Sequence, residues 1–383
     1  MMMEPKIRLK GFCGEWKDMT IAKVLLINSG RDYKHLSEGD IPVYGTGGYM
    51  LSVNESLSSV DAIGIGRKGT IDKPQYLKAP FWTVDTLFFM TPQKGFDLSF
   101  IYNLCQKINW RNYDESTGVP SLSKNNINSI DVSAPSLPEQ RALATFFTSL
   151  DNQISAAEKR LASLKQVKAA SLQAMFPQEG ETTPKLRFKG CEGEWKKEKL
   201  GECGTFSKGK GYSKADICAE GTPIILYGSM YTNNSTIIDK VDTYAKINDG
   251  AVLSKGGEII IPASGETPED IAIASVVKRD GILLGGDLNI ITLGEGYDPT
   301  FIALGITYSK THVELSKYAQ GKSVVHLHNS EIAQGSIMCP NSLTEQRQIA
   351  SYFTALDRQL SAQSSKISKL KQIKSACLDQ MFV

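Results

Sequence analysis

Residues 137–176 read LPEQRALATFFTSLDNQISAAEKRLASLKQVKAASLQAMF, and residues 343–382 read LTEQRQIASYFTALDRQLSAQSSKISKLKQIKSACLDQMF. The two stretches align without a gap at an offset of 206, and 20 of their 40 positions are identical. An internal repeat of this quality decides the architecture of a chain, because each copy is expected to fold as the same structural unit. The protein is therefore expected to contain one structural frame twice.

A second, shorter repeat begins each half of the chain. Pro5–Lys17 reads PKIRLKGFCGEWK, and Pro184–Lys196 reads PKLRFKGCEGEWK, at an offset of 179. The regions that follow, about 18–136 and 197–342, show little similarity to each other. We therefore expect the two copies of the frame to hold two different globular domains.

The globular regions are expected to be mixed α+β. Short apolar segments bounded by glycine favour strands, for example at 62–66, 271–277 and 288–293. The fold class predicted is thus α+β, with two globular α/β domains separated by two long helices. The expected parts are a globular domain at 1–136, a helix at 137–177, a second globular domain at 178–341 and a second helix at 342–383.

The repeated stretches have the apolar spacing of a coiled coil, with alternating steps of four and three residues. Each would form a helix of about 39 residues, roughly 58 Å long at 1.5 Å per residue. The two apolar seams either bury only each other, or the helices also offer a second face to partner proteins. The seam positions are Leu143, Phe147, Leu150, Ile154, Ala157, Leu161 and Leu164 in the first copy and Ile349, Phe353, Leu356, Leu360, Gln363, Ile367 and Leu370 in the second.

Two local features refine this expectation. The pairs Ser136/Glu139 and Ser342/Glu345 have the spacing of a capping box, which predicts where each helix begins. Gln363 is a polar residue at a seam position, where it either fixes the register of the pair or marks a partly exposed site.

The composition excludes several classes of protein. The formal net charge is +2, with 41% hydrophobic and 22% charged residues, as in ordinary globular proteins. Nucleic-acid binding with so little net charge would need locally placed basic loops or help from partners. Seven cysteines without a Cys-x-x-Cys pair favour reduced thiols in the cytoplasm over disulfides or a zinc ribbon. No secretory signal and no apolar run of about 18 residues is found, so no membrane association is expected.

The sequence lacks the motifs of enzymes that methylate or otherwise act on nucleic acids. It has no Pro-Pro pair for an amino-methyltransferase, and its one Cys-Pro, Cys339-Pro340, is the reverse of a Pro-Cys nucleophile. Gly321-Lys322-Ser323 resembles a phosphate-binding loop, but Ser316 stands where that loop requires glycine. We therefore expect no catalytic residue, no bound metal and no cofactor in this chain.

Several loops instead combine glycine with cationic, hydroxyl or aromatic side chains. Glycine lets a backbone approach a nucleic acid closely, while such side chains contact phosphates and base edges. Each loop alone could be a solvated turn, but loops lie ahead of the repeated helix in both halves. The candidate DNA-binding residues are Gly47, Tyr49, Arg67, Lys68, Thr70, Ser116, Thr117, Ser121 and Lys124 in the first half and Lys208, Lys210, Tyr212, Lys322, Ser323 and His326 in the second.

The order of these parts resembles the specificity subunit of type I restriction-modification systems. The resemblance covers essentially the whole chain, and it adds Ser264 and Glu266 to the candidate DNA contacts. The segments that carry it are TGVPSLSK (117–124), LPEQRALATFFTSLD (137–151), MFP (175–177), GRKGTI (66–71), FWTVDTLFF (81–89), SGETPEDIA (264–272) and PKLRFKGCEGEWK (184–196).

The resemblance implies a non-catalytic subunit in which two target recognition domains each recognise half of a bipartite, asymmetric site in double-stranded DNA. The two helices would pair antiparallel as a spacer, giving pseudo-twofold symmetry. Two modification subunits would dock on the chain, and two restriction subunits can join them. S-adenosylmethionine, ATP and magnesium would belong to those partner subunits.

The second half departs from the family pattern, because AQGKSVVHLH (319–328) lacks the usual Pro-Ser-Leu. Two alternatives remain open at this stage. One is a stand-alone sequence-specific DNA-binding protein, and the other is a helical interaction scaffold without modification partners.

Overall fold

The computed structural model describes residues 4–232, 235–321 and 324–383. The chain divides into two compact units, which are described separately below. Unit 1 comprises Met1–Glu158 together with Ser365–Val383, and unit 2 comprises Lys159–Ser364.

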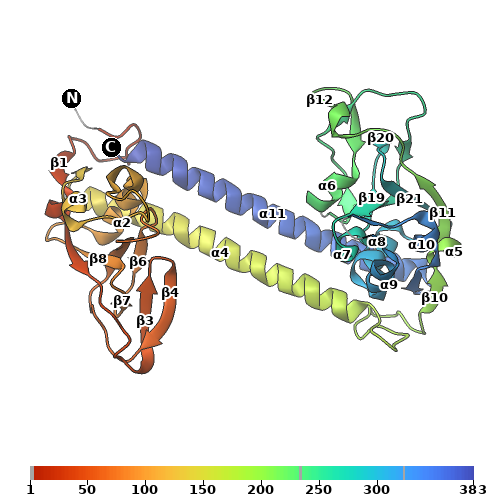
Figure 1. The fold of residues 1–383 in the computed structure, drawn as a ribbon, viewed down its shortest axis with the longest axis horizontal. Helices are drawn as coiled ribbons and strands as arrows, with labels where there is room; N and C mark the ends of the chain where they lie inside the picture. The colour runs from red at the N-terminus through yellow and green to blue at the C-terminus, as the bar shows by residue number, and fades with distance from the viewer. Residues whose placement is uncertain (1–3, 233–234, 322–323) are drawn as a thin grey trace. The chain divides into compact units, whose positions relative to one another are not determined.

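Two long helices dominate the chain, α4 (Leu137–Met175) and α11 (Leu343–Met381) (Figure 1). The division into units passes through the middle of both, so each unit contains the beginning of one long helix and the end of the other. Among the residues that the structure describes, neither these helices nor the shorter ones are long and apolar enough to cross a bilayer.

The described residues of unit 1 form three small sheets, and strands β1 to β8 are red to orange in Figure 1. Its strands are β1 (Lys17–Thr20), β2 (Leu25–Ser29), β3 (Glu38–Gly45), β4 (Gly48–Val53), β5 (Ala62–Gly66), β6 (Gln75–Leu77), β7 (Trp82–Thr83), β8 (Leu87–Pro92) and β9 (Asp131–Ala134). Its short helices are α1 (Ile21–Val24), α2 (Leu98–Lys107), α3 (Lys124–Asn128) and the 3-10 helix η1 (Trp110–Tyr113). The sheet orders are β2-β8-β5-β6, β4-β3-β7 and β1-β9, and only β3 with β7 is parallel.

Unit 2 contains two five-stranded sheets, β11-β21-β17-β19-β14 and β12-β15-β13-β20-β16, and the pairs β10-β23 and β18-β22. Its strands are β10 (Lys196–Lys199), β11 (Gly204–Lys208), β12 (Ile217–Cys218), β13 (Thr222–Ile225), β14 (Ile237–Ile238), β15 (Tyr244–Ala245), β16 (Leu253–Lys255), β17 (Glu258–Pro262), β18 (Ser264–Gly265), β19 (Ser275–Val277), β20 (Asp280–Leu284), β21 (Leu288–Leu293), β22 (Val325–His326) and β23 (Ser336–Cys339). Its short helices are α5 (Leu200–Cys203), α6 (Tyr227–Thr232), α7 (Pro268–Ile271), α8 (Pro299–Tyr308), α9 (Lys310–Tyr318), α10 (Asn329–Gln334) and the 3-10 helix η2 (Lys214–Asp216).

The predicted strands are mostly confirmed. β5 and β21 have the bounds expected at 62–66 and 288–293. The strand expected at 271–277 is partly wrong, because Ile271 ends the short helix α7. Thr267 caps that helix by accepting a hydrogen bond from the Asp270 amide, and Pro268 fits its first turn. These local signals outweigh the apolar composition that favoured a strand.

The core of unit 1 is closed by an aromatic cluster that joins both ends of the chain. The ring of Phe382, just beyond α11, stacks on Phe100 of α2, with the centroids 5.3 Å apart. It also contacts Trp16 of the opening segment at 6.0 Å and Phe147 of α4 at 5.6 Å. All four rings are buried, so the end of α11 fills the core in which α4 begins.

Unit 2 repeats this cluster with the roles of the two long helices exchanged. The ring of Phe176, just beyond α4, stacks on Phe301 of α8 at 5.6 Å. It contacts Trp195 at 6.1 Å and Phe353 of α11 at 6.4 Å. The end of α4 therefore fills the core in which α11 begins.

Within each unit the two long helices run antiparallel, because the first part of one lies against the last part of the other. In unit 1, Lys374 near the end of α11 forms a salt bridge of 2.6 Å with Asp151 near the beginning of α4. Unit 2 contains the repeat of this pair, Lys168 with Asp357, also at 2.6 Å. The seam follows the predicted spacing, and its buried members are Leu143, Phe147, Leu150, Ile154, Ala157, Ile349, Phe353, Leu356 and Ile367.

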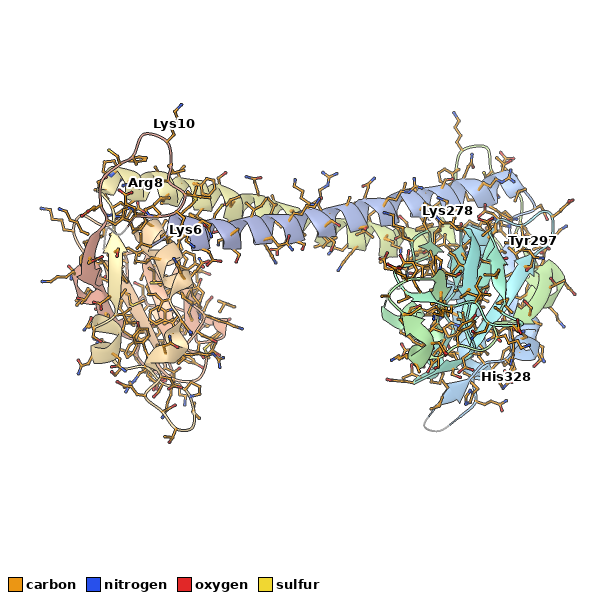
Figure 2. The ribbon with its side chains drawn as sticks, turned by 90° about the horizontal axis from the view of Figure 1, so that it is seen from above. Lys6, Arg8, Lys10, Lys278, Tyr297 and His328 are labelled. Atoms are coloured by element: carbon orange, nitrogen blue, oxygen red, sulfur yellow. The ribbon has the colours of Figure 1, made fainter. Side chains whose placement is uncertain are left out.

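A buried ion pair ties each opening segment to the beginning of a long helix. Arg8, which is labelled in Figure 2, donates two parallel hydrogen bonds to the carboxylate of Glu139, both at 2.8 Å. Arg187 donates to Glu345 in the same way, at 2.9 and 2.7 Å. The predicted capping boxes are confirmed in part: both helices begin directly after the serines, and the hydroxyl of Ser342 accepts from the amide of Glu345 at 3.4 Å. The prediction is wrong for the two carboxylates, which bind the arginines. An arginine distant in sequence outcompetes the local backbone amide, since a bidentate ionic contact is stronger.

The glutamine that follows each of these glutamates holds a globular domain to the helix. The side chain of Gln140 accepts a hydrogen bond from the backbone amide of Asp97, which caps α2, at 3.0 Å. Gln346 accepts from the amide of Asp298, which caps α8, at 2.8 Å. The repeated Glu-Gln sequence thus makes the same two attachments in each unit.

We expect Glu139→Gln to destabilise unit 1 by about 1–3 kcal/mol, because the charge-assisted hydrogen bonds between Arg8 and this buried carboxylate are lost. Urea unfolding followed by tryptophan fluorescence measures this change. The matched control is Asp72→Asn, since the partner of Asp72 is Arg111, whose side chain is 72% exposed. Equal effects of the two substitutions would contradict a special role for the buried pair.

Candidate nucleic-acid interface

Two loops that are far apart in the sequence meet in unit 1. Lys68, in the loop after β5, forms a β-bridge with Ser121, in the loop before α3. The amide of Leu122 donates to the carbonyl of Arg67 at 2.9 Å, so the two segments form a short antiparallel ladder. The structure thus brings together the GRKGT and STGVPSLSK loops that the sequence indicated separately.

Two cations of these loops converge on one aromatic ring. Arg67 Cζ and Lys124 Nζ each lie 5.9 Å from the centroid of Phe88, on β8. Lys124 is the first residue of α3, whose N-cap is Ser123. None of the salt bridges found among the described residues involves Arg67, Lys68 or Lys124. These cations therefore remain available to an anionic or acceptor-rich ligand.

The turn between β3 and β4 lies beside the same loops. Gln75 of β6 donates a hydrogen bond to the carbonyl of Thr46 at 3.2 Å and so fixes the turn. A Cβ atom on Gly69 would lie 3.9 Å from Oγ1 of Thr46, which brings the turn close to the GRKGT loop. Gly47 and Tyr49 are exposed there, and the side chain of Tyr49 is 62% exposed.

Asp114 organises the loop before α3, and the sequence analysis missed it. Its Oδ1 accepts from the amide and hydroxyl of Ser116, at 3.0 and 2.9 Å, and from the amide of Ser121 at 2.9 Å. The backbone amides of Ser121 and Ser116 hold the pKa of Asp114 below its usual value. Thr117 and its neighbours are thereby presented on a fixed, exposed loop. The Asp-x-Ser spacing was a usable signal, since aspartate often accepts from the amide two residues on.

We expect Asp114→Asn to loosen this loop without unfolding unit 1. The loop order that the carboxylate provides is present above its ordinary pKa of about 3.9 and is lost as the pH falls through its lower folded value. Asparagine imitates the uncharged state at every pH. Hydrogen exchange at the amides of Ser116 and Ser121 should become severalfold faster at neutral pH, whereas Asp131→Asn should leave it unchanged. Unaltered exchange in Asp114→Asn would refute this role.

The equivalent loops of unit 2 meet in the same way. Ser264 of β18 pairs with His326 of β22, and its Oγ lies 3.1 Å from Nδ1 of that histidine. The amide of Leu327 donates to the carbonyl of Ala263 at 3.1 Å. The loops therefore keep the backbone arrangement of unit 1, although this segment lacks the Pro-Ser-Leu pattern. Glu266 is exposed beside the ladder.

A hollow of about 810 Å³ lies next to β18 in unit 2, and Glu266 is among its lining residues. Tyr231 also lines it, and its hydroxyl donates to the carbonyl of Ser264 at 2.6 Å. Burial raises the pKa of Tyr231, so this hydroxyl stays protonated and holds the loop. Two candidate contacts of the sequence analysis, Lys322 and Ser323, lie outside the described residues.

The basic segment at the end of β11 supplies two exposed cations and a tyrosine that fixes the loop. Lys208 ends β11, and Lys210 follows it on the surface. Tyr212 is less free than the sequence suggested, because its hydroxyl donates to the carbonyl of Lys246 at 3.1 Å and accepts from the amide of Asn248 at 2.9 Å. It positions the loop through these two bonds.

The histidine pair of unit 2 is stacked. The rings of His326 and His328 lie 6.2 Å apart with an interplanar angle of 8° (His328 is labelled in Figure 2). In the part of the chain that is described, no group of three or more histidine, cysteine, aspartate or glutamate residues is placed to hold a metal ion.

The duplicated frame and its two loop pairs define a protein class. The chain belongs to the family of the type I restriction modification DNA specificity domain, whose model matches residues 14–166 and 192–372. The two matches fall on the two halves that the internal repeat defines.

Individual relatives agree with this family. The chain is 20% identical over 298 residues to the Type I restriction enzyme MjaVIII specificity subunit of Methanocaldococcus jannaschii, covering 74% of this chain and 68% of that protein. In fold it is similar to the crystal structure of a type I restriction-modification S subunit from M. genitalium, with a TM-score of 0.70, 15% identity, and 100% and 99% of the two chains covered. A chain from a structural study of complex assembly and conformational transition of the type I R-M system matches with a TM-score of 0.52, 15% identity, and 96% and 97% coverage.

Proposed function

We propose that this chain is the DNA-recognition subunit of a type I restriction-modification complex. Each unit recognises one part of a bipartite, asymmetric site in double-stranded DNA. The chain itself performs no catalytic step, and its role is to choose the sequence and to hold the partner subunits on it.

The observation that carries this proposal is the pair of equivalent loop ladders. Lys68 with Ser121 in unit 1 and Ser264 with His326 in unit 2 occupy the same place in a duplicated frame. Their side chains differ, as two recognition elements for two different sequences require. Arg67, Lys68 and Lys124 lie at the ladder of unit 1, and Glu266 and His326 lie at that of unit 2. They combine charged groups, which suit phosphates, with polar groups, which suit base edges.

The partners follow from the family. Two modification subunits would dock on the long helices and supply S-adenosylmethionine and the methyl transfer to adenine, and two restriction subunits would add ATP- and magnesium-dependent functions. In unit 1 a shallow hollow runs beside α4, lined by residues with short side chains such as Ala144, Thr148 and Ala156. Short side chains let another helix approach closely, so we propose this face for partner contact.

The test compares methylated adenines in the DNA of a host that carries the modification subunits with the wild-type chain, with no chain, or with the double variant Arg67→Ala/Lys68→Ala. We expect a two-part methylated motif only when the wild-type chain is present. In the double variant, methylation of that motif should fall roughly tenfold or more, because contacts to DNA are removed. Co-purification of the modification subunits should be unchanged.

Each outcome has a definite meaning. The same methylation without the chain, or a motif that forms one continuous block, would overturn the proposed function. Full methylation by the double variant would overturn the assignment of its loop. Equally specific binding by the chain without any partner would favour a stand-alone DNA-binding protein.

A further inference from the structure

The strand register of the two units shows which side chains occupy equivalent positions around the loop ladders. In unit 1, β5 and β8 pair Ile65 with Phe88. In unit 2, β17 and β21 pair Ile261 with Asn289. The ring of Phe88 is therefore replaced by the amide of Asn289.

The ladders themselves extend this correspondence to the loops. Lys68 forms a bridge with Ser121, and Ser264 pairs with His326 in the same way. Lys68 is therefore equivalent to Ser264, and Ser121 is equivalent to His326. Around the ladder, unit 1 has a platform of six residues, Arg67, Lys68, Thr70, Phe88, Ser121 and Lys124. The equivalent platform of unit 2, in the same order, is Ala263, Ser264, Glu266, Asn289, His326 and Asn329.

The cation–aromatic cluster of unit 1 is absent as a whole from the unit 2 platform. Where unit 1 has two cations over the ring of Phe88, unit 2 has Ala263, Asn289 and Asn329. Asn289 is fully buried, and its amide donates to the carbonyl of Leu327 at 2.7 Å. This asparagine therefore serves the backbone and supports no cation.

The charges of the two platforms differ accordingly. The six residues of the unit 1 platform carry three positive charges. The carboxylate of Glu115, whose amide donates to the carbonyl of Ser121, lies beside them, but it already accepts from the hydroxyl of Ser123 at 2.9 Å. The unit 2 platform carries one negative charge, the exposed carboxylate of Glu266, with the histidine counted as neutral. Outside the platform, Lys208 is paired with Asn289 on the neighbouring strand, where unit 1 has Ser29 paired with Phe88. Unit 1 thus presents hydrogen-bond donors, whereas unit 2 adds a strong acceptor.

Base edges in the major groove also differ in whether they donate or accept hydrogen bonds. Guanine presents two acceptors, N7 and O6, which arginine and lysine bind. Cytosine and adenine present an exocyclic amino group, which is a donor, and a glutamate accepts from such a group. A carboxylate is repelled by phosphates, so an exposed Glu266 in a DNA interface is better suited to a base edge.

We propose that the two platforms contact base edges of opposite hydrogen-bonding character. Unit 1 recognises the acceptor edge of a guanine through Arg67 and its neighbouring cations. Unit 2 recognises the amino group of a cytosine or adenine through Glu266. This inference rests on the proposed function and names the chemistry of its two half-sites.

The test uses the full chain in complex with the modification subunits and a DNA library in which one base pair of the methylated motif is randomised at a time. Arg67→Gln should lower the preference for guanine at one position of one part of the motif, roughly tenfold to hundredfold. Glu266→Gln should lower the preference for cytosine or adenine by a similar factor at one position of the other part, because an amide both donates and accepts.

Two control variants remove the same charges elsewhere. Lys94→Gln changes an exposed cation in the turn after β8, and Glu295→Gln changes an exposed carboxylate in the equivalent turn after β21. Both should leave every preference unchanged. The inference is overturned if Arg67→Gln and Glu266→Gln affect the same part, weaken methylation of all sequences equally, or change nothing. In each of those cases, a two-part methylated motif with the wild-type chain still supports the proposed function. If the wild-type chain gave no two-part motif, the proposed function and this inference would both be overturned.

Discussion

The rest of the structure depends on the closure of each core by the end of a long helix that begins in the other unit. Phe382 completes a cluster with Trp16 and Phe100, and Phe176 does the same with its own partners. Neither globular domain can bury its central rings without that helix end. Burial of large aromatic side chains provides much of the stability of a core, so the clusters fix where each helix must finish. The buried Arg–Glu pairs then fix where each helix begins.

This frame separates stability from recognition. The aromatic clusters, the Arg–Glu pairs and the Asp–Lys bridges between helices recur in both units with equivalent geometry. The two platforms share only their backbone arrangement. Their side chains differ: unit 1 has three cations, whereas unit 2 has a carboxylate and a histidine. A duplicated frame can therefore accept different loop contents, because the groups that hold it together lie away from the exposed loops.

The sequence predicted the parts of the structure that depend on local periodicity or on repetition. The heptad spacing located both long helices and most of their buried seam, and Gln363, the polar exception in that seam, is half-buried. Contacts between distant segments were not predictable in this way. Glu139 has the spacing of a capping box, but its partner Arg8 lies 131 residues away. The meeting of the Arg67 and Ser121 loops, and the ring of Phe88 between their cations, likewise follow from strand register and not from any local motif.

The most direct test of the closure is hydrogen exchange in the variant Phe382→Ala, which removes the ring at the end of α11. Loss of a buried phenylalanine side chain costs about 3–5 kcal/mol. We expect faster exchange around Trp16 and in α2, while α8, whose unit contains the beginning of α11, keeps its protection. Faster exchange in α8 to the same degree, or no change in α2, would contradict the crossing of the two helices between the cores.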